Sequence, residues 1–372
     1  MNYLNTIESA FICFPFIAFL FTIPFMIHEY RKYGSIPKLR IAIIYSFILY
    51  LMCAYFLVIL PLPDRKLVAL LTTPRVQLIP FSFIKDIIER LNFSSATLFI
   101  KSLPNFALLQ ALFNICLVIP FGIYLHYYFK QDMKHTVLYS FLLSLFFELT
   151  QLSGLYFIYP RGYRLFDVDD LMLNTLGGFI GYGIANILSK KLPSREDIDA
   201  YAIKKGQHVS FIRRALSFCI DIPFFVFIAL IDDFNLYQTN DFIRLLVAVV
   251  IYYGIFMSFT HGKTIGCYLT GLKVAKKDGK DASFPHYFIR YFIFYFVFML
   301  TPYYIMWINS SFEGALGFLL TLCTIIYYIY VVIHTIHFVA TGKEFWYEKY
   351  SNTKLISVSK EQKKSKWFLL YF

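Results

Sequence analysis

The stretch IAIIYSFILYLMCAYFLVIL at residues 41–60 decides the fold class, because it contains no charged side chain. About 20 apolar residues form one helical crossing of roughly 30 Å of hydrocarbon. Backbone groups in lipid cannot bond to water, so such a run is expected to be helical. A membrane β-barrel would alternate apolar and polar residues over about 10 positions, and this stretch does not alternate.

Similar runs recur along the chain, which is 58% hydrophobic and only 16% charged. Soluble domains carry about 25% charged residues, so this chain lacks the polar surface that water would require. We therefore predict an all-α, polytopic helical membrane protein with about nine transmembrane helices, in the runs 9–27, 41–60, 106–128, 136–158, 171–188, 214–231, 243–260, 288–307 and 315–337.

The basic residues indicate the orientation. Most of the 35 Lys and Arg residues lie at 28–40, 129–135, 189–214, 261–285 and 338–372, which the predicted helices place on one side. Short cytoplasmic loops carry an excess of Lys and Arg. We therefore expect the N-terminus outside and the C-terminus in the cytoplasm of a multi-pass membrane protein. Since the charge follows the membrane segments and no base-stacking module is present, nucleic acid is not an expected partner.

A charged stretch divides the predicted helices into two groups. We predict a membrane domain of about five helices at 1–190, a cytoplasmic linker at 191–209, a membrane domain of about four helices at 210–345 and a basic cytoplasmic tail at 346–372. In the linker, PSREDID resembles a helix start with Ser194 as the cap.

Two segments outside the predicted helices also have membrane-binding features. The outer loop 61–105 contains the amphipathic stretch KDIIERLNF, which fits either a short helix in the membrane interface or an ordinary folded loop. The lysines of the tail should be attracted to anionic lipid.

A dense polar group lies in and between the fourth and fifth predicted helices. Glu148 and Gln151 share a helical face, and at 1.5 Å per residue Glu148 lies just beyond the membrane midplane toward the outside. The next segments add Arg161, Arg164, Asp167, Asp169, Asp170 and Asn174. Polar side chains are costly in a membrane, so this density favours an outward-facing polar pocket over simple pinning of helices. The aspartates lack the spacing of an EF-hand, and no metal is predicted.

These residues resemble the VanZ family. The segments ELTQ at 148–151 and GYRLFDVDDLMLNTLGGFIGY at 162–182 are similar to its Glu and Gln, followed by R-x-x-D-x-D-D and N-T-x-G-G; QLIPF and NICLVIPFG also match. The resemblance covers about 10–190 and implies a bacterial envelope protein, some members of the family lowering susceptibility to teicoplanin-type glycopeptides. The binding residues it carries over are Asn114, Glu148, Gln151, Arg164, Asp167, Asp169, Asp170 and Asn174. Gly177 and Gly181, in the same motif, form a small-residue face suited to close helix packing.

The second group begins with FIRRALSFCIDIPFF at 211–225. Asp221 lies two helical turns beyond Arg214 on the same face, and a carboxylate inside a membrane helix needs a partner. We expect Arg214 or Arg290 to be that partner. Further on, VAKKDGK predicts a turn in which Gly279 takes a positive φ.

This second pattern resembles the RDD family over about 210–340. The matching residues are Arg214, Asp221, Asp278 and Arg290, whereas Cys267 stands where the family usually has a basic residue. The resemblance implies a membrane domain, some members of which are reported to act in cation/proton exchange. The alternative is that Arg214 and Asp221 only anchor the helix.

Three functions follow. The first is an outward-facing site for a glycopeptide, cell-wall or lipid-linked ligand. The second is a cation/proton antiporter in which Glu148 and Asp221 exchange protons. The third, an enzyme on lipid-linked substrates, is less favoured because no nucleophile–base pair is recognisable. No cofactor is predicted, and the expected partners are membrane lipids, a glycopeptide or cell-wall precursor, and a partner membrane protein or a second copy.

Overall fold

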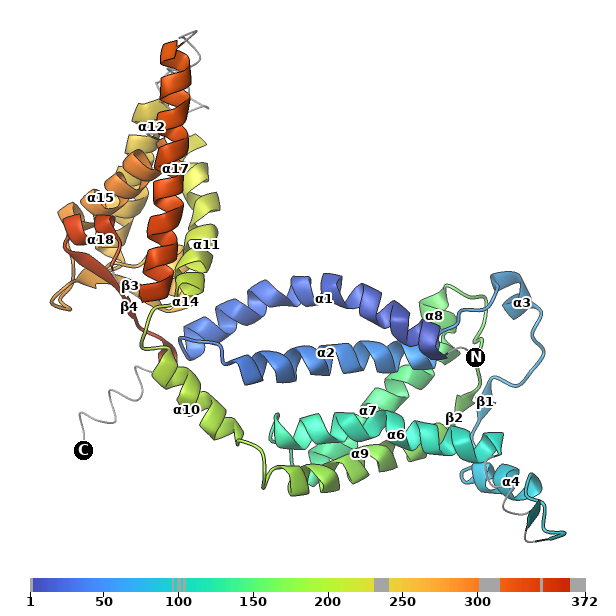
Figure 1. Cartoon of the computed structure of the whole chain (residues 1–372). Helices are drawn as coiled ribbons and strands as arrows, with labels where there is room; N and C mark the ends of the chain where they lie inside the picture. Colours follow the sequence, from blue (N-terminus) through green and yellow to red (C-terminus); the bar gives the residue numbers. More distant parts are fainter. Residues whose placement is uncertain are drawn as a thin grey trace. The chain divides into compact units, whose positions relative to one another are not determined.

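The computed structural model describes residues 3–95, 97–98, 102, 105–230, 241–300, 315–341 and 344–361. It is mostly helical (Figure 1). Two compact units are present, the first formed by Met1–Thr22 and Pro37–Asp199 and the second by Ile23–Ile36 and Ala200–Phe372.

The first unit is built from long helices with short elements between them. Its long helices are α1 (Tyr3–Lys32, whose last part belongs to the second unit), α2 (Lys38–Ile59), α6 (Phe106–Tyr127), α7 (Met133–Leu152) and α9 (Val168–Leu188). The short helices are α3 (Arg65–Ala69), α4 (Ser82–Glu89) and α8 (Gly154–Phe157). Strands β1 (Val76–Gln77) and β2 (Phe166–Asp167) pair in parallel, a small sheet that the all-α prediction omitted.

Helices α6 and α9 pack closely through glycines, as the small-residue face predicted. A Cβ atom at Gly177 would lie 2.2 Å from the carbonyl oxygen of Ile115, and one at Gly181 would lie 2.2 Å from that of Ile119. No larger residue fits at either position without moving a helix. This close approach brings the polar residues of α6 and α9 within hydrogen-bonding reach.

Helix α7 ends earlier than the apolar run 136–158 predicted. It stops at Leu152, and the following Gly154, Leu155 and Tyr156 all have positive φ. Gly154 adopts this conformation without strain, and its carbonyl accepts a hydrogen bond from the Tyr159 amide at 2.8 Å. Glu148 therefore lies four residues before the end of its helix.

The second unit combines helices with one two-stranded sheet. Its helical elements are α11 (Phe211–Leu230), α12 (Asp241–Ala248), η2 (Val249–Phe256), α13 (Met257–Phe259), α14 (Ile265–Thr270), α15 (Phe284–Phe292), η3 (Ile293–Leu300), α17 (Ala315–Thr341) and α18 (Trp346–Tyr350). Strands β3 (Leu272–Lys276) and β4 (Thr353–Ser357) pair antiparallel. Its core is aromatic and includes Phe225, Tyr252, Tyr253, Tyr287 and Tyr295.

Several local predictions can be compared with the structure. Helix α10 (Arg195–Lys205) starts after Ser194, whose hydroxyl accepts from the Asp197 amide at 3.1 Å. Gly279 has a φ of +88° as predicted. Within the predicted tail 346–372, residues 346–350 form α18 and residues 353–357 form β4, and both elements belong to the second unit. Residues 362–372 lie outside the described part.

The helices agree with a multi-pass membrane protein. Five of them are long and apolar enough to cross a membrane: Asn5–Lys32, Lys38–Ile59, Phe106–Tyr127, Val168–Leu188 and Leu316–Phe338. Helices α7 and α11 each have 20 residues but contain charged side chains. The end of the eighth predicted run, 301–307, lies outside the described residues. The number nine and the orientation stay predictions.

Candidate functional site

A cavity of about 710 Å³ opens in the first unit between α2, α6, α7 and α9. Its walls combine apolar side chains, Phe106 and Phe113 among them, with polar groups. Seven of the eight residues carried over from the first motif line it: Asn114, Glu148, Gln151, Arg164, Asp167, Asp170 and Asn174. Residues separated by up to 60 positions in the sequence therefore meet at one cavity.

Asp170 and Asn114 link α9 to α6 at the cavity. The Asn114 side-chain amide donates to Oδ1 of Asp170. Among the described residues this is the hydrogen bond that the Asp170 side chain receives, so the carboxyl group retains capacity for further donors. A ligand with hydroxyl or amine groups could supply them.

Asn174 lies one helical turn further along α9. Its amide nitrogen donates to Oγ of Ser144 at 2.8 Å, and that hydroxyl donates to the carbonyl of Asp170 at 3.3 Å. Oδ1 of Asn174 is buried without a hydrogen-bond partner among the described residues. A buried acceptor of this kind is costly when unpaired, so it is a position where a ligand or a water can bind.

Glu148 and Asp167 connect α7 to the start of α9. Oε2 of Glu148 accepts a hydrogen bond from the Asp167 amide at 3.0 Å, and Oδ1 of Asp167 caps α9 by accepting from the Asp169 amide at 2.9 Å. Burial raises the pKa of the Asp167 carboxyl above its ordinary value, and the hydrogen bond from Asp169 offsets part of that effect.

The side chains of Arg164 and Gln151 donate hydrogen bonds to backbone carbonyls at the end of α2. Arg164 donates to the carbonyls of Val58 at 2.6 Å and Leu60 at 3.1 Å, and Gln151 also donates to Val58, at 2.9 Å. A cation at the C-terminus of a helix is favoured by the helix dipole. Arg164 thus shapes the cavity wall.

Asp169 does not line the cavity. It is 2% exposed, and its carboxylate accepts hydrogen bonds from the Phe81 amide at 2.6 Å, the Ser82 hydroxyl at 2.7 Å and the Phe83 amide at 2.9 Å. These bonds fix the start of α4 against α9. Asp169 is therefore a structural residue that positions the segment containing α4.

Sequence reasoning missed two polar residues of this region. Gln110 lines the cavity four residues before Asn114, and Ser144 contacts Asn174 four residues before Glu148. The four-residue spacing places each on the same helical face as a predicted site residue, and this spacing could have identified them.

In the second unit, Asp221 joins α11 to two other elements. It is 3% exposed and accepts hydrogen bonds from the Tyr252 hydroxyl at 2.7 Å, the Thr264 hydroxyl at 2.6 Å and the Gly266 amide at 2.7 Å. The expected pairing of Asp221 with Arg214 or Arg290 was wrong. Neutral donors satisfy this carboxylate instead.

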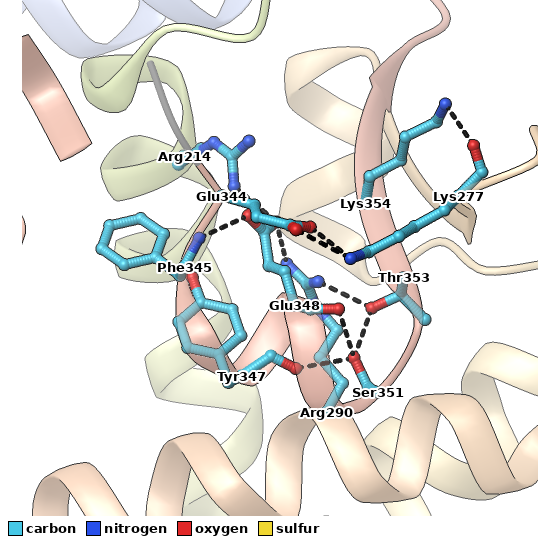
Figure 2. A network of polar contacts seen from close by, with 10 residues as sticks. All are labelled: Arg214, Lys277, Arg290, Glu344, Phe345, Tyr347, Glu348, Ser351, Thr353 and Lys354. Atoms are coloured by element: carbon cyan, nitrogen blue, oxygen red, sulfur yellow. Dashed lines mark hydrogen bonds and ion pairs between the residues drawn. The ribbon is translucent and has the colours of Figure 1, made fainter. Parts of the chain in front are cut away.

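Arg214 and Arg290 share a different carboxylate. Figure 2 shows both guanidinium groups at Glu348, where Oε1 is 2.7 Å from Arg214 Nη1 and 3.0 Å from Arg290 Nη2. Arg290 also donates to the Thr353 hydroxyl at 2.9 Å. Burial alone would raise the pKa of Glu348, but the charges of Arg290 and Arg214 outweigh it, and the pKa lies below its ordinary value.

Arg213, which sequence reasoning passed over, is completely buried. It donates to the carbonyls of Thr270 at 2.8 Å, Gly34 at 2.9 Å and Gly271 at 2.6 Å. The repeated arginine in FIRRA was the available signal. Asp278 lies elsewhere, in an exposed turn where it accepts from the Lys280 amide at 3.0 Å.

The described residues contain no cluster of three or more His, Cys, Asp or Glu side chains that could hold a metal ion. The cavity of the first unit thus offers hydrogen-bonding groups beside apolar walls.

Comparison with protein families assigns each half of the chain to a family. The VanZ/LLP1 family model matches residues 47–189, and the RDD family model matches residues 208–334. Searches of curated proteins and of solved structures found no significant match. The chain therefore contains a VanZ/LLP1 domain followed by an RDD family domain.

Proposed function

We propose that the chain is a bacterial envelope protein whose VanZ/LLP1 domain binds a cell-wall precursor or glycopeptide from the non-cytoplasmic side. The observation that carries this proposal is the cavity of about 710 Å³, where Glu148, Asp170 and Asn174 lie beside apolar side chains. Pockets of roughly 300–1,000 Å³ enclose a drug-sized molecule. A sugar or peptide head group fits this size, and a whole glycopeptide would insert only part of itself.

The polar groups have distinct roles in this proposal. Glu148 and Asp170 accept hydrogen bonds from ligand hydroxyl or amine groups, and Asn174 Oδ1 accepts another. Asn114 orients Asp170. Arg164 and Gln151 fix the end of α2 that forms the opposite wall. The apolar walls accommodate the lipid chain of a precursor or the hydrophobic part of a glycopeptide. A binding role, rather than catalysis, is proposed for these residues.

The test is teicoplanin susceptibility of a susceptible bacterial host that expresses the protein. Asp170→Asn and Glu148→Gln should return the inhibitory concentration to that of the host alone, because each alters the acceptor groups. Gly183→Ala is the matched control, since a Cβ atom at Gly183 meets no other atom within 4 Å. If both cavity variants insert into the membrane and leave the inhibitory concentration unchanged, the proposed resistance function is wrong.

A second candidate is cation/proton exchange at Glu148. Among the described residues its carboxylate accepts one hydrogen bond, so it can exchange a proton for an ion. Asp221 is less suited because three donors already occupy it. Sodium-dependent proton flux in vesicles that is lost in Glu148→Gln would support exchange. Wild-type vesicles without flux would exclude it.

A further inference from the structure

A second cavity, of about 360 Å³, lies within the RDD family unit. Its lining comes from α11, η2, α14, α15, η3, α17, α18 and β4. It includes Arg214 and Arg290 together with the apolar side chains of Phe218, Phe294 and Val331. Part of this lining lies beyond residue 334, where the family match ends. The cavity thus depends in part on a C-terminal segment that lies beyond the family match.

The charged end of this cavity holds two guanidinium groups around one carboxylate. Arg214 and Arg290 both bind the same oxygen of Glu348 (Figure 2). The Nε atoms of both arginines are buried without a hydrogen-bond partner among the described residues. Asp221 also lines the cavity, but three neutral donors engage it. The arginines therefore retain donor capacity that an anion can use.

Most of the remaining lining is apolar or aromatic. Phe218 lies one turn beyond Arg214 on α11, and Phe294 lies one turn beyond Arg290. A small inorganic anion would leave these walls without contacts. An uncharged apolar molecule would leave the buried Nε groups unpaired, which is unfavourable for a buried hydrogen-bond donor.

We propose that this cavity binds an anionic amphiphile, with one carboxylate or phosphate group at Arg214 and Arg290 and an acyl chain against Phe218, Phe294 and Val331. The head group competes with Glu348 for the two guanidinium groups. This site is separate from the proposed ligand site of the VanZ/LLP1 domain.

The test uses the full-length protein in phosphatidylcholine nanodiscs and labelled dodecanoate, with protein-free nanodiscs as the background. Thr335→Trp should weaken binding at least tenfold, because Thr335 lines the cavity and the indole fills it. Ile336→Trp is the matched control, since Ile336 is 62% exposed on the same helix. Glu348→Gln should tighten binding by removing the competing charge.

Competition identifies the head group. Dodecanoate and dodecyl phosphate should compete, and the tighter of the two indicates whether the natural ligand is a fatty acid or a phosphorylated lipid. Dodecanol competing as well as dodecanoate would overturn the proposal, and so would inorganic phosphate at the same concentration. Unchanged binding in Thr335→Trp would also overturn it, whether or not Glu348→Gln folds.

Discussion

The two domains differ in how many hydrogen bonds their buried charged groups make. In the VanZ/LLP1 domain, Glu148 and Asp170 each receive one hydrogen bond from the described residues and face a large cavity. In the RDD family domain, Asp221 receives three and Arg213 donates to several carbonyls. Charge is buried in both domains, but only the first leaves its carboxylates open to a ligand.

This difference separates a structural charge from a binding group. A buried charge is costly in either domain, so burial alone does not distinguish the two roles. The remaining hydrogen-bonding capacity does. Substitution of Asp221 or Arg213 should therefore cost mainly stability, whereas substitution in the VanZ/LLP1 cavity should cost mainly binding.

The largest effect is expected for Arg213→Met. The substitution leaves the carbonyls of Gly34, Thr270 and Gly271 without their donor. Breaking a buried charged network costs about 3–5 kcal/mol. Thermal unfolding of the purified protein should show a strongly lowered midpoint and loss of monodisperse material in size-exclusion chromatography. An unchanged midpoint would mean that this arginine is not structural.

A smaller loss is expected for Gly181→Ala in the VanZ/LLP1 domain. The added Cβ atom would lie 2.2 Å from the carbonyl oxygen of Ile119, so α6 and α9 must separate. Such overpacking costs about 1–3 kcal/mol. Gly183→Ala, on the same helix with open space around it, should be neutral or stabilising by up to about 1 kcal/mol. Equal thermal stability of the two variants would contradict the close packing.

The close contact of α6 and α9 was predictable because small residues at a four-residue spacing have a direct consequence for helix distance. The end of α7 was not. The run 136–158 is apolar beyond Leu152, and the turn there depends on the backbone of Gly154 and its contact with Tyr159. Composition therefore placed the end of this helix too far along the chain. The motif nevertheless identified most of the polar residues that line the cavity.

The hydrogen-bond and ion-pair partners of the RDD family residues were harder to predict from the sequence. Asp221 and Arg214 share a helical face, which suggested a pair, but Tyr252 and Thr264 reach Asp221 through the fold. Glu348 is 134 residues from Arg214, and no periodic pattern connects them. Helix α18 is followed by β4, which pairs with β3, and that pairing is a tertiary feature.

A direct comparison of the domains uses the same substitution in each. Asp221→Asn removes the charge that holds three donors and should destabilise the protein by about 1–2 kcal/mol. Asp170→Asn should cost less than about 1 kcal/mol, because Asn114 can still donate to the new amide oxygen. Thermal midpoints in one detergent compare the two. A larger loss for Asp170→Asn would reverse the assignment of structural and binding roles.

The pH dependence should have opposite signs in the two domains. Glu348 has a lowered pKa, so its contribution to stability is present above about pH 4.5 and is lost as the pH falls through its folded pKa. Asp167 has a raised pKa, so its ionised form disfavours the folded state, and stability recovers as the pH falls. Thermal unfolding midpoints should be measured from pH 7 to pH 3.5. As the pH falls, the midpoint of the wild type should decrease relative to that of Glu348→Gln and should increase relative to that of Asp167→Asn. If the midpoints of the wild type and both variants change in parallel with pH, the inferred environments of Glu348 and Asp167 are wrong.

The smallest effect on stability is expected for Asp278→Asn. Asp278 is exposed and accepts a hydrogen bond within its own turn, which an Asn side chain can also do. Exposed substitutions of this kind change stability by within about 0.5 kcal/mol. Because the structural cost is so low, any strong loss of a cellular phenotype in Asp278→Asn would have to come from a partner or ion that contacts the carboxylate. Asp278 is thus the residue of the RDD motif whose charge is left accessible, and a thermal midpoint measured beside the phenotype separates the two effects.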